Sequence, residues 1–292
     1  MQPLFFTIES DPGLAKNLSQ QLGAEIGKLN MRQFPDGESY LRVDTDCRNR
    51  SVIIFCNLFQ PDDKLLKLIF LASTLRELGA KKIGLITPYL AYMRQDKRFQ
   101  PGECISSRPF AKLLSEQLDW LVTLDPHLHR YHSLDEIYSL QSRVCHAAPK
   151  IAEWIKNTIQ KPLLIGPDSE SEQWVSHVAS LADAPFQVLS KIRRGDYDVE
   201  VSLPEVERWQ NHTPVLVDDI ISSGRTMQET VTHLKSSVPQ TAVCIGVHGL
   251  FSDEAYSQLS MQAEVITCNS IPHLSNQIDI CSTLSDAARE FI

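Results

Sequence analysis

The stretch VLVDDIISSGRTM, from Val215 to Met227, joins an apolar run to a polar turn. Val215–Val217 predicts a buried strand, two adjacent aspartates follow it, and a helix is expected from Thr226. In open α/β sheets, ligands bind beyond the carboxyl ends of the strands. The stretch therefore predicts an α/β fold with a binding site in this turn.

The chemistry of the turn favours a phosphorylated sugar. Backbone N–H groups at a helix start attract anions, and Ser222, Ser223 and Gly224 allow the chain to wrap closely around a phosphate. Asp218 and Asp219 would repel that phosphate, so their expected partners are sugar hydroxyls or a bridging metal ion. Phosphate and sugar hydroxyls together indicate a phosphoribose. An ordinary strand–turn–helix with solvated acids is the alternative.

Composition restricts the class of protein. The 292 residues are 42% hydrophobic, which provides core for one large domain or two ordinary ones. The net charge of −8 and the pI near 5.6 argue against a nucleic-acid or anionic-membrane partner. Seven cysteines without a CxxC pair or zinc spacing fit reduced core thiols. With no signal-like start and no membrane-length apolar run, a cytoplasmic protein is expected.

Short β-rich runs alternate with helical patterns along the chain. Strands are predicted at Leu4–Ile8, Ser51–Cys56, Ile83–Thr87, Trp120–Leu124, Leu163–Gly166, Phe186–Leu189, Val215–Val217 and Ala242–Val247. Helices are predicted at Asp62–Leu78, Phe110–Leu118, Ile151–Ile159, Val175–Leu181 and Thr226–Lys235. Such alternation predicts parallel sheets with helices on both faces. It restarts after Pro149, so two α/β domains are expected, at residues 1–145 and 146–292, with no residue-level repeat between them.

A long cationic segment follows one of these strands. Thr87–Leu114 reads TPYLAYMRQDKRFQPGECISSRPFAKLL and concentrates Arg94, Lys97, Arg98 and Arg108 within an acidic chain. Its prolines and glycine predict a long non-helical excursion, and such loops in compact domains are commonly functional lids. A cationic lid would neutralise a triphosphate and shield it from water. A solvated basic loop is the alternative.

Three further segments carry polar side chains beside predicted strands. FPDGESYLRV, from Phe34 to Val43, reads as a hairpin with a Pro-Asp-Gly turn. LDPHLHRYHS, from Leu124 to Ser133, holds an aspartate and three histidines without the spacing of a tight zinc site. SKIRRGDYDVEV, from Ser190 to Val201, places basic residues after a strand, as a surface basic run also would.

The order and spacing of these motifs resemble the ribose-phosphate pyrophosphokinases. The phosphoribose turn is shared with phosphoribosyltransferases, but the PY, RQDKRF and GExISSR pattern and the FxDGE hairpin are typical of the pyrophosphokinases. The resemblance, closest to compact archaeal-type members, implies two phosphoribosyltransferase-like α/β domains, each a mainly parallel sheet flanked by helices, with the active site between them. It implies magnesium-dependent transfer of a diphosphoryl group from ATP to O1 of ribose 5-phosphate, giving phosphoribosyl diphosphate and AMP, by a homodimer or larger homo-oligomer.

The resemblance also implies a role for each motif. The ring of Phe34 would stack on adenine, and the other ATP-binding residues would be Asp36, Gly37, Glu38, Arg94, Gln95 and Asp96. Magnesium carried by ATP would bind His127 and Asp168. The catalytic residues would be Lys191 and Arg193, which would stabilise the transferring group. Ribose 5-phosphate would bind Arg193, Asp218, Asp219, Ser222, Ser223, Gly224, Arg225 and Thr226.

Two segments depart from the family pattern. In GPDSESEQWV, Glu170 and Ser171 stand where the family has glycines whose backbone contacts the diphosphate. Arg225 stands where many pyrophosphokinases have glycine, and it adds a phosphate partner. The altered diphosphate loop supports one alternative, a non-catalytic regulatory homologue that binds nucleotide or phosphoribose. A phosphoribosyltransferase is the second alternative, and the hairpin and the cationic segment argue against it.

Overall fold

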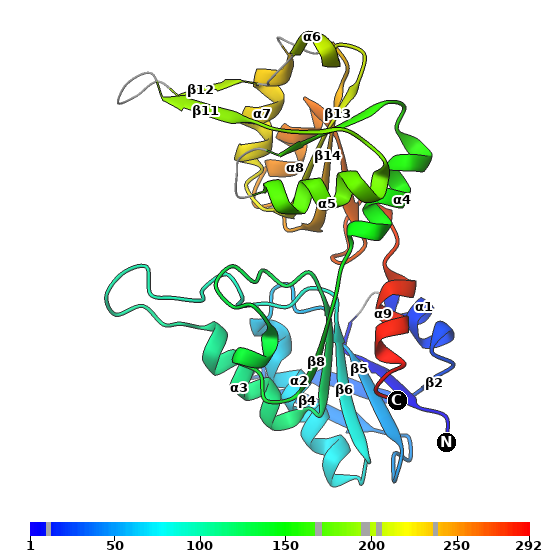
Figure 1. Cartoon of the computed structure of the whole chain (residues 1–292). Helices are drawn as coiled ribbons and strands as arrows, with labels where there is room; N and C mark the ends of the chain where they lie inside the picture. Colours follow the sequence, from blue (N-terminus) through cyan, green and yellow to red (C-terminus); the bar gives the residue numbers. More distant parts are fainter. Residues whose placement is uncertain (10–12, 167–170, 194–198, 203–205, 236–238) are drawn as a thin grey trace. The chain divides into compact units, whose positions relative to one another are not determined.

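A computed structural model of the chain describes residues 1–9, 13–166, 171–193, 199–202, 206–235 and 239–292, with the backbone alone described at 190–193, 199–202 and 206–207. Contacts divide the chain into two units. The first unit is Met1–His146 with Cys281–Ile292, and the second is Ala147–Ile280. Each unit contains a six-stranded parallel sheet with helices against it (Figure 1), which confirms the predicted fold class.

The sheet of the first unit has the order β2 (Glu25–Ile26), β1 (Leu4–Thr7), β5 (Ser51–Phe55), β6 (Lys82–Thr87), β7 (Trp120–Leu124) and β8 (Gln141–Cys145). An antiparallel hairpin of β3 (Leu29–Gln33) and β4 (Ser39–Val43) follows β2. The helical segments are α1 (Gly13–Gln21), α2 (Asp62–Glu77), α3 (Ser107–Gln117), the 3-10 turn η1 (Leu134–Glu136) and α9 (Cys281–Ala288). The central strands are almost wholly buried, as unbroken apolar runs require.

Helix α2 shows how local sequence sets the boundaries of an element. Asp62 and Asp63 occupy its first turn, where carboxylates interact favourably with the positive end of the helix dipole. Just beyond its end, Gly79 has a φ of +89°, a conformation that glycine adopts without strain. Between these ends, Leu68, Leu71 and Leu75 are buried in one core with side chains of α3 and of the sheet.

The sheet of the second unit has the order β10 (Phe186–Val188), β9 (Pro162–Gly166), β13 (Thr213–Ile221), β14 (Ala242–Gly249), β15 (Ala263–Cys268) and β16 (Asn276–Ile278). An antiparallel hairpin of β11 (Ser190–Arg193) and β12 (Val199–Ser202) follows β10. The helices are α4 (Ala148–Thr158), α5 (Glu172–Ala182), α6 (Val206–Trp209), α7 (Arg225–Lys235) and α8 (Ala255–Ser260). Helices α4 and α5 pack together, and α7 packs against α8.

The two units share one topology. Counted along the chain without the hairpins, the strands of both sheets lie in the order 2-1-3-4-5-6, and in both units the antiparallel hairpin falls between the second and third strands. No residue-level repeat accompanies this architecture in the sequence. The repeat is therefore one of backbone topology, and equivalent positions in the two units can be compared directly.

The C-terminal segment differs from the expected domain division at residue 145. Residues 281–292 return to the first unit after the whole second unit has been completed. Helix α9 contacts α1, β7 and β8, and Leu284 is fully buried. The ring of Phe291 stacks on that of Trp120 at 5.1 Å. This apolar packing covers the face of the sheet that carries Trp120, so the first unit is discontinuous in sequence.

A core truncation tests this division. Leu284→Ala is expected to lower the free energy of unfolding by about 2–5 kcal/mol, because it removes a fully buried side chain. Hydrogen exchange should accelerate in peptides from β7 and β8. The control, Leu113→Ala on α3, replaces a side chain that is 42% exposed and should change little. Faster exchange confined to β13 and β14 would contradict the assignment of α9 to the first unit.

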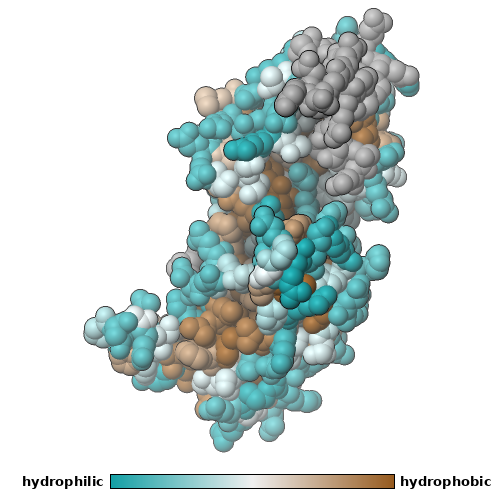
Figure 2. All heavy atoms as spheres, turned by 90° about the vertical axis from the view of Figure 1, so that its left-hand side faces the viewer, coloured by the Kyte–Doolittle hydropathy of each residue, from teal (hydrophilic) through white to brown (hydrophobic). Residues whose placement is uncertain are grey.

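The face drawn in Figure 2 is largely hydrophilic, with hydrophobic side chains gathered in patches in both the lower and the upper half of the picture. Within the described ranges, the helices all fall short of the length and apolarity needed to cross a membrane. The seven cysteines are free, and six of them are buried.

Candidate active site

The predicted phosphoribose turn lies at the carboxyl end of β13. The strand extends to Ile221, so Asp218 and Asp219 belong to its last residues and do not follow it as predicted. Asp218 pairs with Gly246 of β14, and its carboxylate accepts a hydrogen bond of 2.9 Å from the N–H of Asp219. Both aspartates are half-buried. The acids are therefore held in a regular ladder at the edge where a ligand would bind.

The loop between β13 and α7 is short and tied on two sides. Gly224 has a φ of +65°, and its carbonyl accepts the N–H of Gln228 in the first turn of α7 at 2.9 Å. The carbonyl of Ser222 accepts the N–H of Ser252 at 3.1 Å. Because α7 begins at Arg225, its first N–H groups face away from the helix body and are suited to an anion. The two aspartates, the hydroxyl and glycine residues of the turn and the start of α7 thus lie next to one another, as the sequence predicted.

The position of this loop in the sheet is the one expected for a ligand site. Strand order reverses between β9 and β13, and α/β sheets bind ligands in the crevice outside the strand ends at such a reversal. Of the predicted diphosphate loop on the β9 side, Asp168 and Glu170 lie outside the described residues. Ser171 is described at the N-cap position of α5, where its backbone carbonyl accepts the N–H of Val175 as the first hydrogen bond of the helix.

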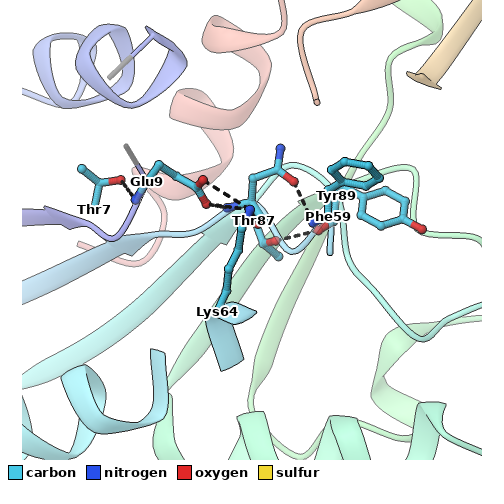
Figure 3. Close-up of polar contacts among 7 residues, drawn as sticks. Thr7, Glu9, Phe59, Lys64, Thr87 and Tyr89 are labelled. Atoms are coloured by element: carbon cyan, nitrogen blue, oxygen red, sulfur yellow. Dashed lines mark hydrogen bonds and ion pairs between the residues drawn. The ribbon is translucent and has the colours of Figure 1, made fainter. Parts of the chain in front are cut away.

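The equivalent position in the first unit is occupied by its own side chains (Figure 3). There the order reverses between β1 and β5. The carboxylate of Glu9 accepts the N–H of Asn57 at 2.8 Å and lies 3.3 Å from the ammonium of Lys64, which also donates to the Asn57 carbonyl at 2.6 Å. Cys56 and Leu58 beside them are fully buried. An ion pair and buried apolar side chains thus lie at this reversal in the first unit.

The predicted nucleotide hairpin is formed by β3 and β4. Its turn is closed by hydrogen bonds from Gly37 N–H to the Phe34 carbonyl (2.9 Å) and from Phe34 N–H to the Glu38 carbonyl (2.8 Å). The carboxylate of Asp36 accepts the N–H of Glu38 at 3.2 Å, and Gly37 has a φ of +91°. Phe34, Asp36 and Glu38 are exposed on this turn. The turn chemistry therefore presents all three side chains to solvent.

Sequence reasoning missed a cation in this hairpin. The guanidinium of Arg32 lies 4.5 Å from the ring centre of Phe34 and 4.4 Å from that of Tyr40. Cation–π contacts of this length hold a ring in place. Alternation along the strands could have indicated the contact, since Arg32 and Phe34 are two residues apart. A pocket of about 220 Å³ lies beside them, lined by residues of the hairpin and of α2 that include Tyr40, Lys67 and Phe70.

The cationic segment forms an irregular excursion from β6 to α3, as predicted. We call residues 94–106 the cationic loop. Arg94 is exposed, whereas the side chain of Gln95 accepts a hydrogen bond of 2.9 Å from the Ser106 hydroxyl. The carboxylate of Asp96 is paired with Arg130 at 2.9 Å, and its side chain is 2% exposed. Of the three nucleotide ligands predicted in this loop, Arg94 is thus the exposed one, Gln95 is half-buried and Asp96 is buried.

Residues 125–133, which we call the histidine loop, follow β7. Asp125 has a φ of +33°, a strained conformation for a residue with a side chain, and its carboxylate bonds to the ring of His146 at 2.8 Å. That hydrogen bond raises the pKa of His146 above its ordinary value. His127 is half-buried, with its ring centre 6.0 Å from that of His129. Backbone strain held in this way is common at functional sites.

The predicted catalytic pair lies in the hairpin of the second unit. Lys191 and Arg193 belong to β11, opposite Val201 and Val199 of β12, and the structure describes their backbone alone. Within the described part of the chain, no three His, Cys, Asp or Glu side chains are arranged as a metal site. Magnesium usually keeps several waters and takes one or two protein ligands together with substrate phosphates.

The fold and the phosphoribose loop define a protein built from two phosphoribosyltransferase-like domains. A family model described as the N-terminal domain of ribose phosphate pyrophosphokinase matches residues 4–117, and one described as a phosphoribosyl transferase domain matches residues 133–280.

The chain is similar to relatives of about the same length over most of its residues. A ribose-phosphate pyrophosphokinase of Sulfolobus acidocaldarius is 30% identical, covering 94% of this chain and 95% of the relative. That of Saccharolobus solfataricus is 32% identical, covering 85% of each. The crystal structure of phosphoribosylpyrophosphate synthetase from Mycobacterium smegmatis has the same fold, with a TM-score of 0.85, 24% identity, and coverage of 99% and 98%. The chain belongs to the ribose-phosphate pyrophosphokinase family.

Proposed function

We propose that the chain transfers the diphosphoryl group of ATP to O1 of ribose 5-phosphate, giving phosphoribosyl diphosphate and AMP. The observation that carries the proposal is the loop of residues 218–226, which joins two carboxylates in a strand to the free N–H groups at the start of α7. The carboxylates suit ribose hydroxyls or their metal ion, and the N–H groups suit the 5-phosphate. Family membership supplies the donor, ATP.

The proposed residue roles are those that the resemblance to the family implies for the matching positions of this chain. Ser222, Ser223, Gly224, Arg225 and Thr226 hold the 5-phosphate, while Asp218 and Asp219 orient the ribose. The nucleotide is bound by Phe34, Asp36, Gly37, Glu38, Arg94 and Gln95, with Asp96 shaping the cationic loop. Lys191 and Arg193 stabilise the transferring group, and Arg193 also contacts the acceptor. Such a reaction rests on positioning and charge stabilisation, so no nucleophilic side chain is required.

Magnesium is the proposed metal ion, and His127 and Asp168 are its proposed protein ligands. When bound, the ion would neutralise charge on the phosphates of ATP. The half-buried imidazole of His127, on a loop whose strained start is fixed by Asp125 and His146, gives a ligand of defined position.

Phosphorus NMR tests the reaction directly. Purified protein with ATP, magnesium and ribose 5-phosphate should release AMP and phosphoribosyl diphosphate in equal amounts. That result would also show that Glu170 and Ser171 are tolerated in the diphosphate loop. If neither product formed while both ligands bound, a regulatory homologue or a different acceptor sugar would replace the proposal.

A phosphoribosyltransferase is not favoured as the alternative. The match to the N-terminal domain of ribose phosphate pyrophosphokinase covers the hairpin and the cationic loop. Release of diphosphate that depended on an added base, with phosphoribosyl diphosphate as the substrate consumed, would reverse this conclusion.

The hairpin supplies a prediction for nucleotide binding. Phe34→Ala is expected to raise the KM for ATP about tenfold, because stacking of a base on an aromatic ring contributes about 1–3 kcal/mol. The control is Phe186→Ala in β10, since the side chains of Phe34 and Phe186 are both 37% exposed. Steady-state kinetics at saturating ribose 5-phosphate measure both variants. Equal KM values in the two variants would remove Phe34 from the nucleotide site.

We also propose a cytoplasmic location and assembly into a homodimer or a larger homo-oligomer. The free cysteines suit a reducing compartment. Large apolar side chains of the first unit, among them Ile26, Leu66 and Phe70, are 45–61% exposed and offer surface that a second copy could bury. Light scattering at working concentration would show a monomer if the assembly proposal were wrong.

A further inference from the structure

The cationic loop is organised as a unit by its own hydrogen bonds. Near its tip, the carboxylate of Glu103 accepts the N–H groups of Phe99 and Gln100 at 2.7 and 3.0 Å, and its carbonyl accepts Nε of Arg98 at 3.0 Å. Gly102, with a φ of +89°, allows the reversal. Compact surface loops whose ends are close together are commonly packed by their own groups in this way.

The two ends of the loop meet at a neck. The hydroxyl of Ser106 donates to the side-chain oxygen of Gln95 at 2.9 Å, and the N–H of Ser107 points to the Gln95 carbonyl at 3.4 Å. Ser107 is the first residue of α3 and is fully buried. The orientation of the whole loop therefore depends on what holds this neck.

Two consecutive residues of the histidine loop hold the neck from outside. Nη1 of Arg130 lies 2.9 and 3.1 Å from the two carboxylate oxygens of Asp96. The hydroxyl of Tyr131 lies 3.4 Å both from the Asp96 carbonyl and from the hydroxyl of Ser107. Arg130 thus contacts Asp96 near the start of the cationic loop, and Tyr131 contacts both Asp96 and Ser107, the first residue of α3.

The contact between Arg130 and Asp96 is the stronger of the two. The side chain of Asp96 is 2% exposed, and that of Arg130 is 38% exposed. A buried carboxylate needs its cation, because removing one partner leaves an uncompensated charge out of water. The guanidinium also lies 5.8 Å from the ring centre of Phe99, which extends its contact into the loop beyond the neck. The pair therefore fixes Asp96 and the chain that follows it.

The histidine loop is itself anchored at both ends, so it can serve as a support. At its start, the N–H of Asp125 donates to the Cys145 carbonyl of β8 at 2.9 Å. At its end, Ser133 and Glu136 form a reciprocal capping box on η1. His127 lies between these anchors, three residues before Arg130. The proposed metal ligand and the support of the cationic loop are thus on one short, fixed segment.

We infer that Arg130 is a positioning residue that holds the cationic loop in register with His127 through its pair with Asp96, with Tyr131 as a weaker second tie. The inference rests on the proposed function, in which the loop closes over the nucleotide whose magnesium His127 binds. Asp96 then acts through the shape of the loop and not by direct contact with ATP.

Limited proteolysis and kinetics together test this role. Arg130→Met should raise the rate of tryptic cleavage after Lys97 and Arg98 about tenfold, because the neck is released. It should lower kcat about tenfold while the KM for ribose 5-phosphate stays unchanged. Asp96→Asn should behave alike, and the double variant should be no worse than either single variant, since each removes the same pair. Tyr131→Phe should give a smaller increase in cleavage.

The control is Arg76→Met, which removes the exposed Arg76–Asp119 pair (2.8 Å) of the same unit and the same number of trypsin sites. Its loop cleavage should equal that of the wild type. Unchanged cleavage after Lys97 and Arg98 in Arg130→Met would overturn the inference. So would an equal increase in cleavage at sites across the whole first unit. A third contrary result would be a double variant whose increase in cleavage equals the product of the two single-variant increases. If the wild type made no phosphoribosyl diphosphate, the proposed function would fail, while the cleavage comparison would still decide whether Arg130 anchors the loop.

Discussion

Lys191→Ala is expected to lower kcat by about 10²–10³-fold, because a preorganised group that stabilises charge in the transition state is typically worth that much. Ground-state binding of ribose 5-phosphate should change little, since that substrate is assigned to the loop of residues 218–226. The KM for ribose 5-phosphate should therefore stay near the wild-type value. Steady-state kinetics with each substrate varied in turn separate the two effects.

The matched control is Lys156→Ala in the last turn of α4, which removes an exposed lysine from the same unit. Its kinetics should equal those of the wild type. An equal loss in kcat and in affinity for ribose 5-phosphate in Lys191→Ala would show that the lysine binds the ground state, and its assignment to the transferring group would fail.

Gly224→Ala is expected to raise the KM for ribose 5-phosphate about 10–100-fold. The φ of +65° at Gly224 is costly for a residue with a Cβ, so the substitution should turn the N–H groups that begin α7 away from the phosphate. A change of that size corresponds to about 1.4–2.7 kcal/mol of binding free energy. The surroundings do not forbid a methyl group, because the nearest atom to a Cβ there would lie at 3.7 Å.

Gly23→Ala separates backbone strain from binding. Gly23 follows α1 in the first unit, has a φ of +60°, and has no atom within 4 Å of the position of a Cβ. Both substitutions should lower the free energy of unfolding by about 1 kcal/mol. Gly224→Ala alone should weaken ribose 5-phosphate binding in a calorimetric titration. Equal affinities in the two variants would argue that the loop does not hold the 5-phosphate.

The elements that could be predicted are short segments whose residues all share one environment, such as a strand buried on both faces of a sheet. WLVTL was predicted as the strand Trp120–Leu124, and β7 has those bounds, because a strand covered on both faces must be apolar throughout. Strand β8, with the sequence QSRVC, was missed because it lies at the edge of the sheet and is partly exposed. The return of α9 to the first unit was missed because no local pattern records which sheet an amphipathic helix will cover.

In the candidate site, too, the features formed by neighbouring residues could be predicted and the contacts between distant residues could not. The turn at residues 222–224 was predictable because its glycine, hydroxyls and helix start are adjacent in the chain. The pairing of Asp96 with Arg130 spans 34 residues, and that of Glu9 with Lys64 spans 55. Neither ion pair could be predicted from spacing or composition, because each of these charged side chains could equally have been exposed to solvent. Long-range ion pairs of this kind required the structure.

The discontinuous first unit has a consequence for the order of events during synthesis. Domains generally fold as they leave the ribosome, with the N-terminal one first. Here Leu284 and Phe291, which cover the face around Trp120, follow the entire second unit in the chain. A nascent chain that has completed the first 146 residues would still expose that apolar face to solvent. We therefore expect the first unit to complete its core only after the second unit has been translated.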